Sequence, residues 1–439
     1  MDYFRILILG ETFRSNGGGG ITLTNLFLDW PPENIGVITD RIDETNPESK
    51  YAYYQLGSEE IKFPFPFYFI QSSVKSGPYH FYPGNKPVGF KESGKTAISG
   101  IKKKIRPFFD KFLRRTGLFL FFYRIRLSES LKKWILDFEP DIVYIQPFHY
   151  RIMQFGNLLF EHLRIPYAVH IMDDSVKYIN NQCLILRGKF QRQIENDFKE
   201  LIFNSKVSMC ISEAMSNEYS RRYGRDFLSF RNPIDIDRWL PFQKKDMNVS
   251  SERLKIIYNG RLFLPTFYSL IDMCLIVNEL NIKNKQVELD IYTYDYNPAF
   301  IKIIQKLRGV RICVPVEIGE IPQLILQYDI FFLCLDFSKS AQDYSQFSIS
   351  TRTSEGMISA VPVLVYAPAN SAMSEYFDKN DAGCVVGERD TMKLEQAILK
   401  LWNDSSYRER ISANAVNTAL SDSNSVIVRE KFRKALTIF

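Results

Sequence analysis

Short apolar runs alternate with helical patterns along the whole chain. The runs are rich in β-branched and aromatic residues and are bounded by turn residues, which predicts buried strands. We expect strands in two sets, at 4–9, 141–146, 167–171 and 207–211, and then at 255–258, 287–292, 310–313, 330–335 and 363–365. Because strands that alternate with helices form parallel sheets, the two sets predict a doubly wound α/β protein.

A polar stretch separates the two sets of strands. Asn232–Asp237 contains an Asn-Pro turn signal, and a charged run occupies residues 244–252. We therefore predict two Rossmann-like domains, residues 1–238 and 239–421. Apolar residues at helical spacing predict one further helical segment, residues 422–439.

Composition places the protein in a broad class before any motif is considered. A chain of 439 residues has ample core for two domains, and no apolar run approaches the ~18 residues of a membrane span. Met1 leads straight into a strand, so we expect no signal sequence. The six cysteines form no C-x-x-C pair, which favours a reducing cytoplasm. The four histidines lack metal-ligand spacing, so we expect no metal.

The net charge of +6 is concentrated in one segment, Lys102–Lys133. Apolar residues at helical spacing, including Phe108, Phe112 and Leu113, share this segment with eleven Lys and Arg. A basic amphipathic helix with bulky apolar residues predicts an interfacial element on an anionic membrane. The alternatives are a core helix with a solvated basic face and a nucleic-acid patch; we favour the membrane and expect no nucleic acid.

The most informative polar loop runs from Ser350 through Thr351 and Arg352 to Glu355. A helix is expected to begin here, and the backbone N–H groups at a helix N-terminus favour an anion such as phosphate. A carboxylate one step into the helix would repel phosphate but suits a ribose diol. The loop therefore predicts a binding site for a nucleoside diphosphate. The alternative is an ordinary loop of an α/β protein.

Three other positions carry candidate chemistry. Glycines at 17–20 follow the first strand and allow the backbone to approach a ligand, although the run is not G-x-G-x-x-G, which argues against a dinucleotide. His170 and Asp173 stand at the end of the strand at 167–171, where polar groups face the ligand crevice of a parallel sheet. Gly260-Arg261 ends the first strand of the second domain, and a guanidinium suits two phosphate oxygens. The alternatives are a surface loop and a satisfied core histidine beside an N-capping aspartate.

These motifs, together with Ser212–Met215 and Asn232–Asp235, occur in an order that resembles one known group. The chain is similar to the retaining GT-B glycosyltransferases of family 4, or group 1, which include bacterial capsule and O-antigen sugar transferases. The resemblance covers roughly residues 4–30 and 141–400. It implies two domains that face each other across a cleft, with the acceptor on the first and the donor on the second. It also implies a last helix that returns to the first domain.

The resemblance assigns roles to individual residues. The implied catalytic residues are His170, acting on the donor sugar, and the diphosphate ligands Arg261 and Arg352. The implied donor-binding residues are Gly18, Gly19, Gly20, Asp173, Gly260, Val316, Ser350, Thr351 and Glu355. Glu355 would hold the ribose, and backbone groups at Val316 would hold the base. Nothing in the sequence distinguishes uracil from guanine.

The function that follows by resemblance is retaining transfer of a hexose from a nucleotide-diphosphate sugar. The acceptor would be a glycan or a lipid-linked glycan in surface polysaccharide synthesis, at the inner face of the cell membrane. No metal or cofactor besides the nucleotide sugar is expected.

Two departures from the family pattern keep other functions open. The Lys-Gly that commonly follows the Arg261 position is absent, and Phe347 stands where many members have the first of two glutamates. A catalytically silent GT-B-like partner subunit is therefore the main alternative. A nucleotide-sugar epimerase or a phosphorylase is a further alternative. A phosphorylase, however, would carry a pyridoxal-binding lysine near the loop at 350–355, and none is present there.

Overall fold

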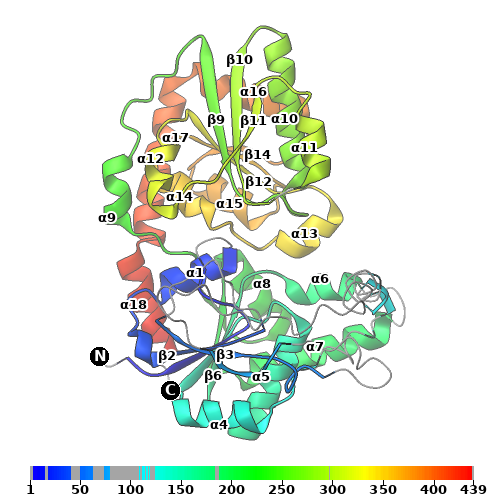
Figure 1. Ribbon diagram of the computed structural model, residues 1–439. Coiled ribbons are helices and arrows are strands. Elements are labelled where there is room, and N and C mark those ends of the chain that lie inside the picture. The colour runs from blue at the N-terminus through cyan, green and yellow to red at the C-terminus, as the bar shows by residue number, and fades with distance from the viewer. Residues whose placement is uncertain are drawn as a thin grey trace. The chain divides into compact units, whose positions relative to one another are not determined.

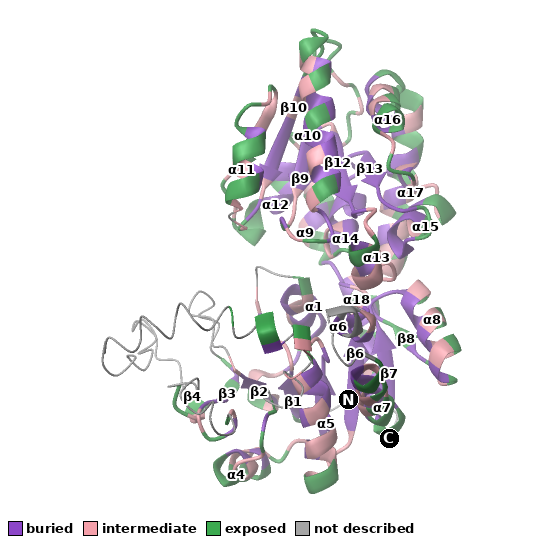
Figure 2. Ribbon diagram, turned by 90° about the vertical axis from the view of Figure 1, so that its right-hand side faces the viewer, coloured by how far each residue is buried: buried purple, intermediate pink, exposed green. Residues whose placement is uncertain are grey.

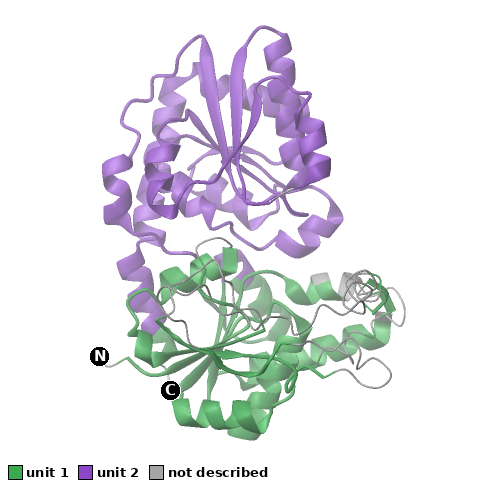
Figure 3. Ribbon diagram, viewed as in Figure 1, with its two compact units in different colours: residues 1–210, 216–228, 434–439 green, residues 211–215, 229–433 purple. Residues whose placement is uncertain are grey.

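The computed structural model describes residues 3–14, 18–40, 50–62, 74–79, 108, 111–113, 115–116, 118, 124–182, 187–295 and 297–437. The pattern of contacts divides the chain into two compact units (Figure 3). Unit 1 consists of Met1–Cys210, Ser216–Leu228 and Lys434–Phe439, and unit 2 consists of Ile211–Met215 and Ser229–Arg433.

Unit 1 is built on an eight-stranded sheet in the order β4-β3-β2-β1-β5-β6-β7-β8. Its strands are β1 Ile6–Leu9, β2 Ile35–Thr39, β3 Ala52–Gln55, β4 Gly77–Tyr79, β5 Ile142–Ile145, β6 Tyr167–Ile171, β7 Val207–Cys210 and β8 Leu228–Ser229. The pairs from β3 to β7 are parallel, and β3 pairs with β4 in antiparallel fashion. Because β1 pairs with both β2 and β5, the winding reverses beside it, and the crevice at the carboxyl ends of β1 and β5 is the place where such sheets bind ligands.

Five of the strands described in unit 1 are buried on both faces. Every residue of β1, β2, β5, β6 and β7 is buried, as the purple strands of Figure 2 show. The helices of this unit are α1 Gly18–Leu26, α4 Glu129–Phe138, α5 Tyr150–Leu163, α6 Ser175–Gln182, α7 Arg187–Asn204 and α8 Glu213–Tyr223, of which α8 begins in unit 2. Such continuous burial on two faces is typical of a parallel sheet between helical layers.

Unit 2 has a six-stranded sheet in the order β11-β10-β9-β12-β13-β14, which is the doubly wound order of a Rossmann fold (Figure 1). The strands are β9 Arg253–Asn259, β10 Gln286–Tyr292, β11 Val310–Cys313, β12 Ile330–Cys334, β13 Val363–Tyr366 and β14 Cys384–Val386. All five pairs are parallel. The reversal of winding lies between β9 and β12, so the carboxyl ends of these two strands define the candidate crevice of this unit.

Alternate residues of the central strands pack into two separate cores. Ile256 and Tyr258 belong to one core and Ile257 to the other, as the two-residue period of a strand requires. One core includes residues of α10 Phe267–Ile282, α11 Pro298–Ile304 and α16 Thr391–Asn403. The other includes residues of α9 Ile236–Trp239, α12 Ile321–Ile325, α14 Arg352–Ile358, α15 Ala372–Lys379 and α17 Ser405–Asp422. The sheet therefore carries helices on both faces.

The last helix, α18 Ser425–Leu436, is divided between the two units. Residues up to Arg433 group with unit 2, where Phe432 lies edge-on against Phe230 at 5.4 Å, and Lys434 onwards group with unit 1. A parallel bridge between Ile234 and Asn424 holds the chain just before this helix. Helix α18 lies within the segment 422–439, for which the apolar spacing predicts a helix.

All nine predicted strands are present, with bounds that differ by at most two residues at each end. The sequence analysis missed β2, β3, β4, β8 and β14. Four of these five lie at or near the outside of their sheets. Within the described ranges, no helix is long and apolar enough to cross a membrane.

Candidate functional site

Arg261 lies at the carboxyl end of β9, one of the two strands that flank the crevice of unit 2. Its Nε is 3.3 Å from the Asp295 carboxylate, which also accepts a hydrogen bond from the backbone N–H of Leu262 at 2.8 Å. The Arg261 side chain is 61% exposed. Asp295 thus orients a guanidinium that remains open to solvent, as a phosphate ligand requires.

Gly260 allows this turn to form. A Cβ on Gly260 would lie 2.9 Å from the ring of Tyr258, whose hydroxyl donates to the Arg261 carbonyl at 2.7 Å. Burial raises the pKa of Tyr258 well above its ordinary value, and the nearby charge of Arg352 opposes part of that rise. The Tyr258 hydroxyl thus contacts the backbone of Arg261, and the charge of Arg352 acts on the same hydroxyl.

Arg352 and Glu355 form an ion pair in the first turn of α14. Nη1 of Arg352 is 2.7 Å from each carboxylate oxygen of Glu355, and the two side chains are 16% and 11% exposed. The sequence analysis assigned these residues to two different parts of a ligand, and the pairing between them was not foreseen. Because a carboxylate has about four lone-pair sites, the pair leaves acceptor capacity on Glu355. It also leaves the Nε and Nη2 hydrogens of Arg352 for an anion.

The loop before α14 is arranged as a turn. Ser350 Oγ accepts from the backbone N–H of Arg352 at 3.2 Å, and Thr351 occupies the N-cap position without a side-chain cap bond. A Cβ on Gly356 would lie 2.7 Å from the ring of Phe331, so glycine lets α14 pack closely against β12. The Thr351–Glu355 segment is thereby held beside the central strands of the sheet.

Val316 follows the edge strand β11, and two strands, β10 and β9, separate β11 from β12 in the sheet. Its carbonyl is 3.5 Å from the hydroxyl of Tyr294, and its side chain packs partly against the core. Val314 and Tyr294 nearby are 86% and 64% exposed. The assignment of this loop to the base of a nucleotide stays a prediction.

Gly18, Gly19 and Gly20 lie in the first turn of α1, where the sequence analysis expected a loop. A Cβ on Gly19 would lie 2.7 Å from the ring of Phe148, and one on Gly20 would lie 2.9 Å from the Thr12 carbonyl oxygen, while one on Gly18 would meet no atom within 4 Å. Gly19 and Gly20 are therefore required by the packing of the protein itself. Of the three, Gly18 has the space for a ligand.

His170 is fully buried at the end of β6. Its Nδ1 is 2.6 Å from the hydroxyl of Tyr144 on the neighbouring strand β5. The burial and this hydrogen bond fit a core histidine that bonds within the protein better than they fit a residue exposed in a cleft. The contact of His170 with a donor sugar stays a prediction.

The two aspartates after β6 occupy different surroundings. Asp173 is half-buried, whereas Asp174 is buried and accepts from Arg222 at 2.8 Å and from Tyr219 at 3.0 Å. The Asp174 carboxylate also lies 3.4 Å from the N–H of Lys177 in the first turn of α6. Asp174 thus ties the loop that carries Asp173 to helix α8.

Sequence reasoning missed Asp295, Tyr144 and Arg222 as partners of the predicted residues. An acidic residue three positions after the strand at 287–292 was a usable signal for Asp295. In the sequence, Tyr144 is an ordinary residue of an apolar run, and Arg222 has the pattern of a solvent-exposed charged residue on a helix. Only the sheet order and the burial reveal what these two contact.

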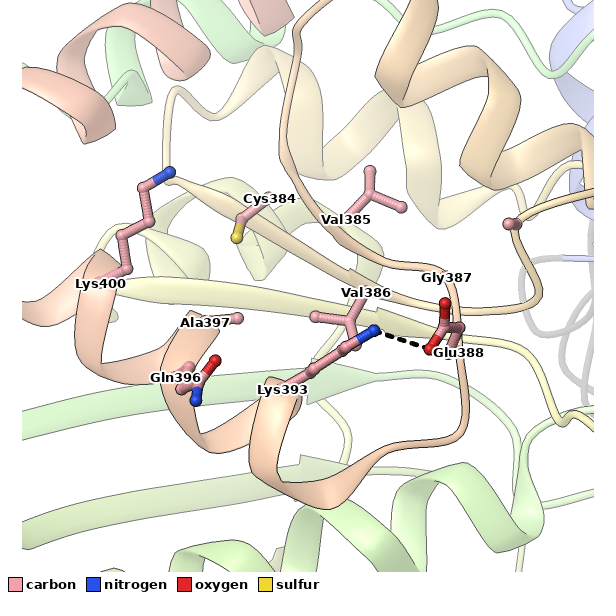
Figure 4. A pocket seen from close by; sticks show the side chains of 10 residues that line it. Cys384, Val385, Val386, Gly387, Glu388, Lys393, Gln396, Ala397 and Lys400 are labelled. Carbon is pink, nitrogen blue, oxygen red and sulfur yellow. Dashed lines mark hydrogen bonds and ion pairs between the residues drawn. The ribbon is translucent and has the colours of Figure 1, made fainter.

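Two cavities of about 380 and 360 Å³ lie in unit 2, and neither is lined by a residue that the sequence assigns to a ligand. The larger lies between β14 and α16, where Lys393 forms a 2.7 Å ion pair with Glu388 (Figure 4). In the part of the chain that the structure describes, no three His, Cys, Asp or Glu side chains are grouped to hold a metal ion.

Comparison with known proteins identifies the fold. A scan against family models finds no match, and a comparison with curated proteins finds none either. Among solved structures, HepE of Anabaena in complex with UDP and glucose matches at a TM-score of 0.64 and 13% identity, over 100% of both chains. Sucrose-phosphate synthase from Thermosynechococcus elongatus matches at 0.61 and 10% identity, over 99% of this chain and 98% of that one.

A third structure extends the same result. WaaG, a glycosyltransferase involved in lipopolysaccharide biosynthesis, matches at a TM-score of 0.60 and 12% identity, over 98% of this chain and 99% of its own. At such identities the likeness concerns the fold. The chain has the GT-B fold of these enzymes, and the predicted fold class is confirmed.

Proposed function

We propose that this protein is a glycosyltransferase that takes a sugar from a nucleoside-diphosphate sugar. The proposal rests on two features of a chain whose whole length has the GT-B fold: an exposed Arg261 after the carboxyl end of β9, and the Arg352–Glu355 pair in the first turn of α14. Two guanidinium groups suit a diphosphate, and a carboxylate suits a ribose diol. HepE, one of the structures with this fold, was solved with UDP-glucose.

The proposed chemistry follows from these groups. As the bond between the sugar and the diphosphate breaks, negative charge develops on the leaving phosphate. Arg261 and Arg352 would stabilise that charge, and fixed donors aimed at developing charge are often the largest contribution to catalysis. We propose that the acceptor attacks from the face that the diphosphate leaves, so that the anomeric configuration is retained. The remaining contribution is positioning of the acceptor.

The acceptor is proposed to be a glycan or a lipid-linked glycan of a surface polysaccharide. Within Lys102–Lys133, the described residues Phe108 and Phe112 are 79% and 55% exposed, and Lys111 is exposed as well. Leu113, a further member of the predicted amphipathic stripe, is buried, and Ile105 and Phe109 lie outside the described residues. Exposed phenylalanines beside cations favour an anionic lipid surface, such as the inner face of the cell membrane.

The test is incubation of the purified protein with a panel of nucleotide sugars. Slow release of a nucleoside diphosphate from one donor is expected, because many transferases leak donor to water, and the responsive donor identifies the base and the sugar. If no donor is consumed and none binds, the silent partner subunit becomes the better explanation. The Arg352–Glu355 pair, which partly neutralises a predicted phosphate ligand, would then be a sign of lost activity.

A further inference from the structure

Two ion pairs lie at the carboxyl edge of the unit 1 sheet. Glu11 follows β1 and pairs with Arg14, and Asp40 follows β2 and pairs with Arg151 in the first turn of α5. The register of β1 and β2 puts Glu11 and Asp40 at equivalent positions beyond the last paired residues, and neighbouring strands lie about 4.8 Å apart. Because β1 lies between β2 and β5, the second pair joins elements on either side of the strand that Glu11 follows.

The turn after β1 fixes the Glu11 carboxylate by one oxygen. Gly10 has a φ of +102°, and a Cβ there would lie 2.2 Å from the carbonyl oxygen of Gln146, so glycine is required for a turn this close to β5. Oε1 of Glu11 accepts from the backbone N–H of Thr12 at 2.9 Å and from Nη2 of Arg14. The carboxylate is therefore held in one orientation before any ligand binds.

The other oxygen of Glu11, Oε2, lies against the first turn of α1. A Cβ on Gly19 would be 3.0 Å from it, and no residue that the structure describes donates a hydrogen bond to it. A carboxylate is stabilised at the N-terminus of a helix, where a phosphate would also be favoured. Because Glu11 already places a negative charge there, a phosphate at the same turn would be repelled.

The two pairs together carry no net charge and remain partly open to solvent. The exposed fractions of the side chains are 11% for Glu11, 38% for Arg14, 28% for Asp40 and 23% for Arg151. An ionised carboxylate only accepts hydrogen bonds and a guanidinium only donates them, whereas a hydroxyl does both. An uncharged ligand with several hydroxyl groups therefore matches this set of donors and acceptors better than an anion does.

We infer that the Glu11–Arg14 and Asp40–Arg151 pairs bind the hydroxyl groups of an uncharged sugar, and that Glu11 rejects a phosphorylated one. The site lies beside the crevice at the carboxyl ends of β1 and β5, where such sheets bind ligands. The inference rests on the proposed function and deepens it, because the sugar bound by unit 1 would be the acceptor. Rejection by a built-in charge is a common source of specificity.

The first test needs no donor. Saturation-transfer difference NMR titrations measure the binding of the methyl glycosides of glucose, galactose, mannose and N-acetylglucosamine, and of the corresponding 6-phosphates. We expect the wild type to bind at least one glycoside and none of the phosphates. Glu11→Gln should raise the Kd of that glycoside about tenfold or more, the loss of a hydrogen bond to a charged group, and should admit its 6-phosphate.

Three results would overturn the inference. They are no binding of any glycoside by the wild type, equal affinity of the wild type and Glu11→Gln for the glycoside, and wild-type binding of a 6-phosphate as tightly as of the glycoside. A purely structural role of Glu11 would lower Tm without changing the ratio of the two affinities. If Glu11→Gln does not fold, as judged by circular dichroism, Asp40→Asn is the second variant, with the same expected loss of glycoside affinity.

Asp141 provides a matched control. Its carboxylate also accepts from a backbone N–H, that of Arg5 at 2.7 Å, but it directly precedes β5 and so lies at the amino edge of the same sheet. Asp141→Asn should leave the binding of both glycoside and phosphate unchanged. A loss of glycoside affinity in this control equal to that in Glu11→Gln would refute the site.

The kinetic test rests on the proposed function. With the donor found in the panel and the glycoside found by NMR, Glu11→Gln should raise the KM for the glycoside about tenfold, and Asp141→Asn should not change it. An equal rise in both variants would contradict the inference. If the wild type consumes no donor, the proposed function fails, while the NMR titrations still decide whether unit 1 binds a sugar through Glu11.

Discussion

Replacing Glu355 with glutamine perturbs the predicted ribose ligand with little change of shape. In the structure both carboxylate oxygens accept from Nη1 of Arg352 at 2.7 Å, and each keeps a further acceptor site. Glutamine replaces one of these oxygens with an NH₂ group. That group faces a guanidinium hydrogen, and it cannot accept a hydrogen bond from a ribose hydroxyl.

The expected cost can be worked from these contacts. A hydrogen bond to a charged group contributes about 1.5–3 kcal/mol, so the Kd of the cognate nucleoside diphosphate should rise about 10- to 150-fold. The ligand-free protein also loses part of the ion pair, whose side chains are largely buried. A loss of about 1–3 kcal/mol in the free energy of unfolding corresponds to a fall in Tm of roughly 2–12 °C.

Isothermal titration calorimetry measures the affinity, and a matched ion pair provides the control. Lys244 and Asp329 are 3.0 Å apart with side chains 12% and 17% exposed, and Asp329 directly precedes β12, at the amino end of the sheet. Asp329→Asn should lower Tm to a similar extent and leave nucleotide affinity unchanged. Equal affinity of Glu355→Gln and wild type for the nucleoside diphosphate would refute the role of Glu355, and so would an equal loss of affinity in the control.

Three further predictions concern the other candidate residues. Arg352→Ala should weaken the binding of a nucleoside diphosphate far more than that of the nucleoside, as titrations of both ligands would reveal; equal losses would make Arg352 structural. His170→Ala should lower turnover while nucleoside diphosphate binding stays nearly unchanged, and loss of folding instead, followed by circular dichroism, would favour a core role. In flotation assays the protein should bind vesicles with anionic lipid and dissociate at high salt, and serine at the four basic positions between 102 and 106 should abolish binding; equal binding to neutral vesicles would contradict a role for charge.

The fold was predictable where strands are central and buried on both faces. Such strands read as continuous apolar runs, and of the nine predicted strands, all of which formed, only β11 lies at the edge of its sheet. Most of the missed strands have weaker signals: β14 has three residues and β8 has two, while β4 contains a proline and a glycine. β2 differs, because Ile35–Thr39 is a clear apolar run from which a strand could have been predicted.

The contacts of the predicted site residues could be derived from the sequence only in part. Spacing placed Arg352 and Glu355 in the first turn of a helix, and residues three apart on a helix are neighbours, so their ion pair could have been foreseen. The packing that makes Gly19 necessary depends on Phe148, far away in the sequence. The burial of His170 beside Tyr144 likewise depends on sheet order. Contacts of this kind appear only once the strands are assembled.

The central claim, that the protein transfers a sugar from a nucleotide sugar, is tested most directly by following one donor with ¹H NMR. The account predicts that the wild type releases the nucleoside diphosphate and that the first free sugar has the anomeric configuration of the donor. It also predicts that release is slower with Glu355→Gln at donor concentrations near KM. Absence of release from every nucleotide sugar tested, under conditions where the protein is folded, would contradict the claim.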